Sequence, residues 1–161
     1  KKTSYYKQQI AKAGKSLIDE DGQAVTETRD GPPNTLLLKA RLLHDGGYYT
    51  RSLEELKSVP SDRFKPEEKE EYHYRMAKNS DALMLNDEAI IHYKKVMSLS
   101  SGVKYYACSS ALSLGHLYEK QQNFILAKQY YNECLVLHPE GYSTSLHQKA
   151  KTALVRIEFK N

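Results

Sequence analysis

The sequence predicts an all-α fold built as an array of antiparallel helix hairpins. Its clearest window, residues 108–139, contains two stretches with apolar residues three and four positions apart, separated by the polar turn at residues 121–123. This spacing is typical of amphipathic helices. A similar pattern recurs upstream, because Ala127, Ala89 and Ser52 occupy corresponding places that are 38 and then 37 residues apart. Recurrence at such a period indicates stacked helical repeats.

The aromatic composition fits the same architecture. The chain has 13 Tyr, 3 Phe and no Trp, and four tyrosine doublets occur, mostly within segments of helical periodicity. A tyrosine can bury its ring while its hydroxyl stays near water. That property suits a thin stack of two helical layers, in which few side chains are fully enclosed.

In the window at residues 108–139, small residues are expected where the two helices of the hairpin cross. Gly115 lies in the first helix and Ala127 in the second, and only a small side chain lets two helix backbones approach closely. Tyr118 and Tyr131 are expected to fill the space on either side. Pro139 should end the second helix, because proline lacks a backbone N–H.

Two earlier copies of the pattern are less complete. In the middle copy, Ala77 stands in the place of Gly115, but serines replace the tyrosine and the closing proline, at Ser80 and Ser101. In the first copy, Ala40 and Ser52 stand at the crossing, and Gly47 falls in the turn. The first copy is therefore recognised by its hydrophobic spacing more than by its individual residues.

The window at residues 108–139 resembles the tetratricopeptide repeat, whose signature is W-x2-L-G-x2-Y, then A-x3-F, then P, over 34 residues. Ala111 replaces the tryptophan, and the other signature places hold the following residues: Leu114, Gly115, Tyr118, Ala127, Tyr131 and Pro139. Some stretches are similar to bacterial members of this family. The resemblance, which covers roughly residues 34–157, implies a right-handed α-solenoid that acts as an interaction scaffold.

The expected organisation has three parts. Residues 1–33 would hold the last helix of a preceding repeat, at residues 3–14, and a linker. Residues 140–161 would form a C-terminal capping helix, because a solenoid needs a solvated end. Three repeats would lie between them, at about residues 34–64, 70–101 and 103–139. Because the chain begins with Lys1, we expect it to be a piece of a longer protein.

Composition excludes several classes of function. The formal net charge is only +4 and the charges are dispersed along the chain, so we expect no nucleic-acid partner. Apolar runs are too short for a membrane span, which needs about 18 residues, so we expect no membrane insertion. The two cysteines, Cys108 and Cys134, form no disulfide framework, which favours a reducing, cytoplasmic location.

The sequence also gives no sign of a catalytic, cofactor-binding or metal site. None of the six histidines belongs to an H-E-x-x-H motif. His73 and His92 fall in different helices and have no acidic residue at a metal-ligand spacing. Cys108 and Cys134 fall on apolar helix positions, where a buried small residue is the ordinary interpretation. We therefore expect no enzyme activity and no cofactor.

The resemblance implies that the first helix of each repeat lines a concave groove, at the second, fifth, ninth and twelfth positions of the repeat. Together with a neighbouring arginine, these positions give the following candidate groove residues: Leu37, Arg41, His44, Tyr74, Arg75, Lys78, Asp81, Leu112, His116 and Glu119. Their middle is basic and aromatic. The family's clamp for a terminal carboxylate is absent, since Leu37 and Arg41 occupy one half of it, and Ser109 and Ser113 the other.

The predicted function is therefore a scaffold that binds a protein or peptide partner in this groove. Arg41, Arg75 and Lys78 would hold a carboxylate or an acidic peptide through charge-assisted hydrogen bonds. One alternative is an architectural or self-association module, for instance a homodimer. Another is an accessory domain of a larger protein whose activity lies outside this sequence.

Overall fold

In the computed structural model of this chain, the described residues are 34–99, 104–139 and 143–158. The helix expected at residues 3–14 lies outside them. Within the described residues the chain forms α-helices and one short 3₁₀ helix, and no strand. The elements are α3 (Thr35–Asp45), α4 (Tyr49–Lys57), η1 (Ser61–Arg63), α5 (Pro66–Ala82), α6 (Asn86–Leu99), α7 (Lys104–Lys120), α8 (Phe124–Val136) and α9 (Ser143–Glu158).

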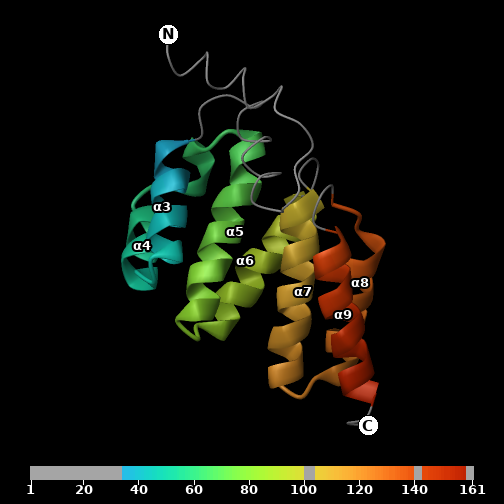
Figure 1. Ribbon diagram of the computed structural model, residues 1–161. Helices are drawn as coiled ribbons and strands as arrows, with labels where there is room; N and C mark the ends of the chain where they lie inside the picture. Colours follow the sequence, from blue (N-terminus) through green and yellow to red (C-terminus); the bar gives the residue numbers. More distant parts are fainter. Residues whose placement is uncertain (1–33, 100–103, 140–142, 159–161) are drawn as a thin grey trace. The chain divides into compact units, whose positions relative to one another are not determined.

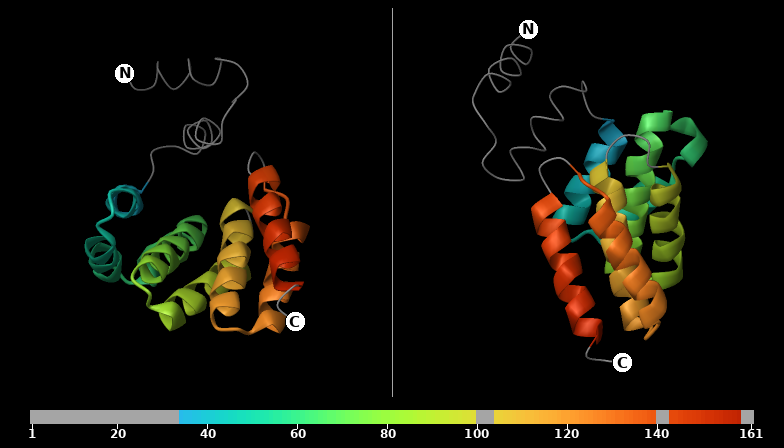
Figure 2. Two further views of the ribbon diagram at one scale, coloured as in Figure 1. Left: turned by 60° about the horizontal axis from the view of Figure 1, so that its bottom comes forward. Right: turned by 90° about the vertical axis from the view of Figure 1, so that its right-hand side faces the viewer.

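The helices pack as successive antiparallel pairs (Figures 1 and 2). The pairs α3–α4, α5–α6 and α7–α8 each form a hairpin, and the second helix of each hairpin contacts the helix that follows it. The final helix, α9, packs against both α7 and α8. This arrangement is the all-α solenoid that the sequence predicted.

The three hairpins turn through the same three-residue connection. The middle residues, Gly47, Met84 and Gln122, all have positive φ, at 80°, 59° and 59°. In each turn the third residue closes a Schellman motif by donating its N–H to the carbonyl five residues earlier. These bonds are Tyr48 N–H to Leu43 O at 2.8 Å, Leu85 N–H to Ser80 O at 2.8 Å and Asn123 N–H to Tyr118 O at 2.9 Å.

The turn at Met84 yields a prediction about stability. Met84 is 82% exposed, so its side chain contributes little packing, while its left-handed backbone conformation costs roughly 1 kcal/mol relative to glycine. We expect Met84→Gly to raise the free energy of unfolding by about 0.5–1 kcal/mol, as measured by urea denaturation. Lys128→Gly, at an exposed site within α8, should lower it by about 1 kcal/mol. A lower free energy of unfolding in both Met84→Gly and Lys128→Gly would contradict the prediction.

Local signals fix several helix starts. Pro66 is the first residue of α5. Proline is well tolerated there because a backbone N–H in the first turn would have no acceptor within the helix. Glu68 reaches back to accept the Lys65 backbone N–H at 3.0 Å, which stabilises the same end. At α8, the side chain of Asn123 caps the helix by accepting the Leu126 N–H at 3.2 Å. These contacts make the hairpin boundaries a consequence of the local sequence.

Small residues lie where the two helices of each hairpin cross, as predicted. Ala40 and Ser52 face each other in the first hairpin, and both are fully buried. A buried hydroxyl needs a partner, and Ser52 Oγ donates to the Ala40 carbonyl at 2.8 Å. In the third hairpin, a Cβ added at Gly115 would overlap the Tyr131 ring. The glycine is therefore required by the close approach of that ring.

The buried side chains form two clusters. The larger runs through α5 to α9 and includes Tyr93 and Tyr131. The smaller joins α3, α4 and the start of α5, where Leu37 and Leu56 pack with Phe64. Each cluster draws on more than one hairpin, so the buried side chains connect neighbouring hairpins along the array.

Candidate partner-binding groove

The first helices of the three hairpins, α3, α5 and α7, carry all ten candidate residues. Nine of them recur at three fixed positions counted back from the turn. Ten residues before the central turn residue are Leu37, Tyr74 and Leu112; six before are Arg41, Lys78 and His116; three before are His44, Asp81 and Glu119. Because α3 contacts α5 and α5 contacts α7, each row runs across neighbouring helices.

The first row lies within the core. Leu37 is 1% exposed, Tyr74 4% and Leu112 7%. The Tyr74 hydroxyl is 3.0 Å from Ser109 Oγ, so it has a hydrogen-bond partner on α7. The sequence analysis placed these three side chains on an open groove surface, whereas the structure places them beneath it. They are buried because each contributes to the contact between neighbouring hairpins.

Arg75, which follows Tyr74 on α5, is also buried, at 8% exposed. Glu71 Oε1 accepts hydrogen bonds from Arg75 Nε at 3.1 Å and from Nη2 at 2.9 Å. The guanidinium carbon lies 5.6 Å from the centroid of the Tyr74 ring and 6.0 Å from that of Tyr106, within the range of cation–π attraction. Burial, the largest single influence, acts to lower the pKa of Arg75, but Glu71, Tyr106 and Tyr74 together raise it above its usual value.

Two further cations, Lys78 and Arg41, act on Tyr105 and Tyr106. Burial raises the pKa of Tyr105, and Lys78 and Arg75 act against that shift. Burial also raises the pKa of Tyr106, where Arg41 is among the groups that oppose it. The surface formed by Arg41, Arg75, Lys78, Tyr105 and Tyr106 is called the basic–aromatic centre below. It joins α3, α5 and α7.

His44 ties α3 to α5 beside this centre. Its Nδ1 lies 3.0 Å from Asn79 Oδ1, an acceptor, so Nδ1 carries the proton. Asn79 in turn donates through Nδ2 to the Arg75 carbonyl at 2.8 Å. Burial lowers the pKa of His44, and Lys78 adds to this effect. His44 is therefore a neutral hydrogen-bond donor within the protein at neutral pH.

The remaining candidates engage the neighbouring helices. Asp81 accepts a hydrogen bond from the Tyr93 hydroxyl at 3.4 Å and lies 4.0 Å from Lys120 Nζ. The His116 ring packs edge-on against the Tyr131 ring at 5.4 Å. These contacts stabilise the packing of the helices. Asp81 and His116 therefore already interact with other residues of the chain, on the face that was predicted to bind another molecule.

Glu119 is hydrogen-bonded to α8 and α9. Its carboxylate accepts the Tyr131 hydroxyl at 2.7 Å, Arg156 Nε at 2.8 Å and Arg156 Nη2 at 2.6 Å. The Glu119 side chain is only 9% exposed. The structure thus joins Glu119 to α8 and α9, and the carboxylate accepts three hydrogen bonds from two residues of the chain itself.

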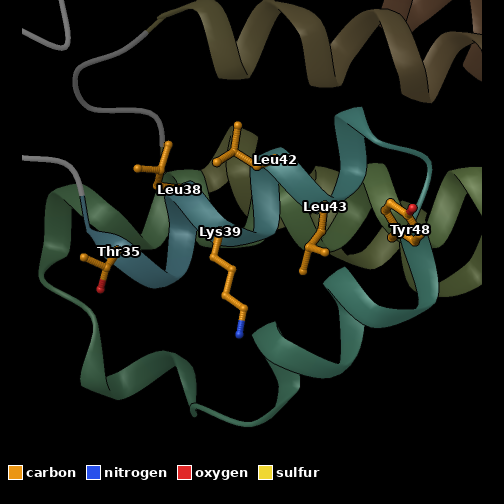
Figure 3. Close-up of a pocket in the computed structure, with 6 residues that line it drawn as sticks. All are labelled: Thr35, Leu38, Lys39, Leu42, Leu43 and Tyr48. Carbon is orange, nitrogen blue, oxygen red and sulfur yellow. The ribbon is translucent and has the colours of Figure 1, made fainter.

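An apolar hollow lies beside α3 (Figure 3). It is lined by Thr35, Leu38, Lys39, Leu42, Leu43 and Tyr48. Leu42 is 60% exposed, whereas Asn79 and Leu117, at the corresponding positions of the next two hairpins, are buried.

The structure also brings together two residue pairs that lie far apart in the sequence. His73 Nδ1 and His92 Nδ1 are 2.9 Å apart, although the sequence analysis placed them in different helices without a connection. Cys108 Sγ and Cys134 Sγ are 3.3 Å apart, buried and unlinked. The described residues contain no group of three or more His, Cys, Asp or Glu arranged to hold a metal ion.

Among the described residues, no helix has the length and apolar character that crossing a membrane would require. Comparison with protein families gives one match, to the tetratricopeptide repeat, over residues 109–139. Comparisons with curated proteins and with solved structures found no match. The third hairpin is therefore a tetratricopeptide repeat, and the array has the solenoid architecture of that family. A repeat of this kind indicates a protein–protein interaction module.

Proposed function

We propose that this chain is an interaction scaffold that binds an acidic protein or peptide segment across α3, α5 and α7. The observation that carries the proposal is the basic–aromatic centre. The Arg75 guanidinium lies beside the rings of Tyr74 and Tyr106 and is paired with Glu71, and Lys78 and Arg41 act on Tyr105 and Tyr106.

The charges of this surface favour an anionic partner. Three cations, Arg41, Arg75 and Lys78, define the basic–aromatic centre, and Glu71 pairs with Arg75. Tyrosine rings beside the cations lower the local dielectric constant and strengthen their attraction for a carboxylate. Arginine adds directional donors, and a carboxylate–guanidinium bond is about twice as strong as a neutral hydrogen bond. Acidic side chains flanked by apolar residues are the partner chemistry that suits such a surface.

The test uses labelled peptides of defined charge. The wild-type protein should bind acidic peptides in fluorescence anisotropy, bind neutral ones more weakly and lose affinity as salt increases. The variant Arg41→Glu/Lys78→Glu should weaken binding of acidic peptides by about tenfold or more, equivalent to about 1.4 kcal/mol. Circular dichroism should show an unchanged helical content.

The matched control is Arg51→Glu/Lys128→Glu, which changes the net charge equally at exposed sites on α4 and α8. It should change the affinity by less than about threefold, because distant exposed charges are screened. An equal loss in both double variants would mean that net charge alone attracts the peptides. That outcome, or the absence of any binding by the wild-type protein, would refute the proposed site.

A further inference from the structure

Two cysteine thiols meet inside the third hairpin. Cys108 on α7 and Cys134 on α8 are both fully buried, and their Sγ atoms are 3.3 Å apart. The two residues are 26 positions apart in the chain, and the sequence contains no other cysteine. A buried cysteine usually packs as a small apolar residue, which is how the sequence analysis interpreted each of them. The contact between the two thiols adds a chemistry that neither has alone.

The distance between the sulfurs is close to that of a covalent bond between them. An S–S bond is about 2.05 Å long, so from 3.3 Å the two sulfurs must approach by about 1.2 Å. Backbone carbonyls lie beside the thiols. The Cys134 carbonyl is 3.3 Å from Cys108 Sγ, and the Leu146 carbonyl on α9 is 3.9 Å from Cys134 Sγ. The fold therefore holds the two thiols within reach of each other.

The pair lies at the end of the hairpin that is opposite its turn. Cys108 is near the start of α7, which begins at Lys104, and Cys134 is near the end of α8, which ends at Val136. Helix ends open at a smaller free-energy cost than the unfolding of the whole domain. A small thiol-reactive molecule can therefore reach the sulfurs through local opening, although both are buried in the closed hairpin.

The contact also makes the two thiols unequal. The hydrogen bond from Cys108 lowers the pKa of Cys134, and burial opposes that shift. The hydrogen bond to Cys134 raises the pKa of Cys108, and burial adds to it. Because the thiolate is the nucleophile in thiol–disulfide exchange, Cys134 should react first and Cys108 second.

We propose that Cys108 and Cys134 form a reversible redox site, at which a small disulfide such as glutathione disulfide converts the two thiols into an internal disulfide. The Cys134 thiolate attacks one sulfur of glutathione disulfide and releases one glutathione thiolate. Cys108 then loses its proton to solvent, attacks the Cys134 sulfur of this mixed disulfide and releases the second glutathione. The net reaction turns two protein thiols and one glutathione disulfide into one protein disulfide and two molecules of glutathione.

The new bond would close the open end of the hairpin. The turn at residues 121–123 already connects α7 to α8, so a disulfide at the opposite end would fix the pair of helices at both ends. Such a bond restricts the unfolded chain, so the oxidised protein should unfold at a higher temperature. No residue of the basic–aromatic centre takes part, so this inference does not depend on the function proposed above.

The first test measures the equilibrium constant for oxidation of the wild-type chain in glutathione buffers, with the protein either native or unfolded in urea. After acid quenching and alkylation, mass spectrometry should show native chains with either two free thiols or none, and a peptide map should join Cys108 to Cys134. The constant should be at least about tenfold larger for the native protein, because unfolding lowers the effective concentration of one thiol near the other. An equal or smaller constant for the native protein would overturn the proposal, as would the formation of only mixed disulfides or disulfides between chains.

The second test compares the thermal unfolding of the two redox forms. The oxidised wild type should have a Tm about 3 °C or more above that of the reduced form, and dithiothreitol should abolish the difference. Cys108→Ala and Cys134→Ala are the matched controls, since each retains one buried thiol, and neither should show this rise in oxidising buffer. An oxidised wild type that unfolds at the same temperature as the reduced form, or at a lower one, would refute the site.

Discussion

Replacing Gly115 with leucine should destabilise the protein by about 1–3 kcal/mol or more, the range for overpacking a well-filled core. Gly115 lies on α7 against the fully buried ring of Tyr131. A Cβ at this position would overlap the ring, and its distance to the Tyr131 Cγ would be 3.0 Å. The ring cannot easily retreat, because its hydroxyl is bonded to Glu119 at 2.7 Å. Urea denaturation followed by circular dichroism measures the loss.

Gln129→Leu provides the control for this variant, because Gln129 is exposed on α8. Its effect should remain within about 0.5 kcal/mol, as is usual for surface substitutions. A double-mutant cycle sharpens the test. At the corresponding positions the first hairpin has Ala40 and Leu56, both fully buried, so Gly115→Ala combined with Tyr131→Leu should cost less than the sum of the two single changes. Purely additive losses, or equal effects at positions 115 and 129, would contradict the assigned contact.

The architecture could be predicted because spacing alone sets the register of the hairpins. Ala40, Ala77 and Gly115 each lie seven residues before the central turn residue, and their partners at the crossing lie five residues after it. Only small residues allow the close crossing, so the pattern survives where other signature positions have changed. Even Ser52 fits, because its hydroxyl is bonded to the Ala40 carbonyl.

The turns were harder to predict. Glycine signals the left-handed residue at Gly47, but Met84 and Gln122 adopt the same conformation with φ of 59°. Nothing in their side chains favours it. The conformation is imposed by the hydrogen bonds that close each Schellman motif and by the packing of the helices on either side.

The exposure of the candidate groove residues was predicted only in part. Positions inferred from a family do not specify which neighbouring side chains cover them. Arg75 and Lys78 lie at the basic–aromatic centre, whereas Leu37 is in the core and Glu119 is held by α9. The pairing of His73 with His92 was missed, although the register implies it. One histidine lies four residues before Ala77 and the other three residues after Ala89, which face each other at the crossing.

Arg156→Met should lower the free energy of unfolding by about 1–2 kcal/mol. The substitution keeps the aliphatic part of the side chain but removes both hydrogen bonds from Arg156 to Glu119. The Glu119 side chain is only 9% exposed, so the loss of these two hydrogen bonds to its carboxylate should be costly. Arg156 itself is 47% exposed, so water offsets part of the loss and the effect stays below the 3–5 kcal/mol typical of a broken buried pair.

Two further variants distinguish this explanation from a general loss of charge on α9. Lys151→Met, at an exposed position on the same helix, should change stability by less than about 0.5 kcal/mol. Adding Glu119→Gln to Arg156→Met should recover part of the lost stability, because a neutral amide costs less to bury than a carboxylate. Amide hydrogen exchange should show faster opening of α9 in Arg156→Met. If Arg156→Met is as stable as the wild type, α9 does not stabilise Glu119. The Glu119 carboxylate would then be a group that a partner could contact.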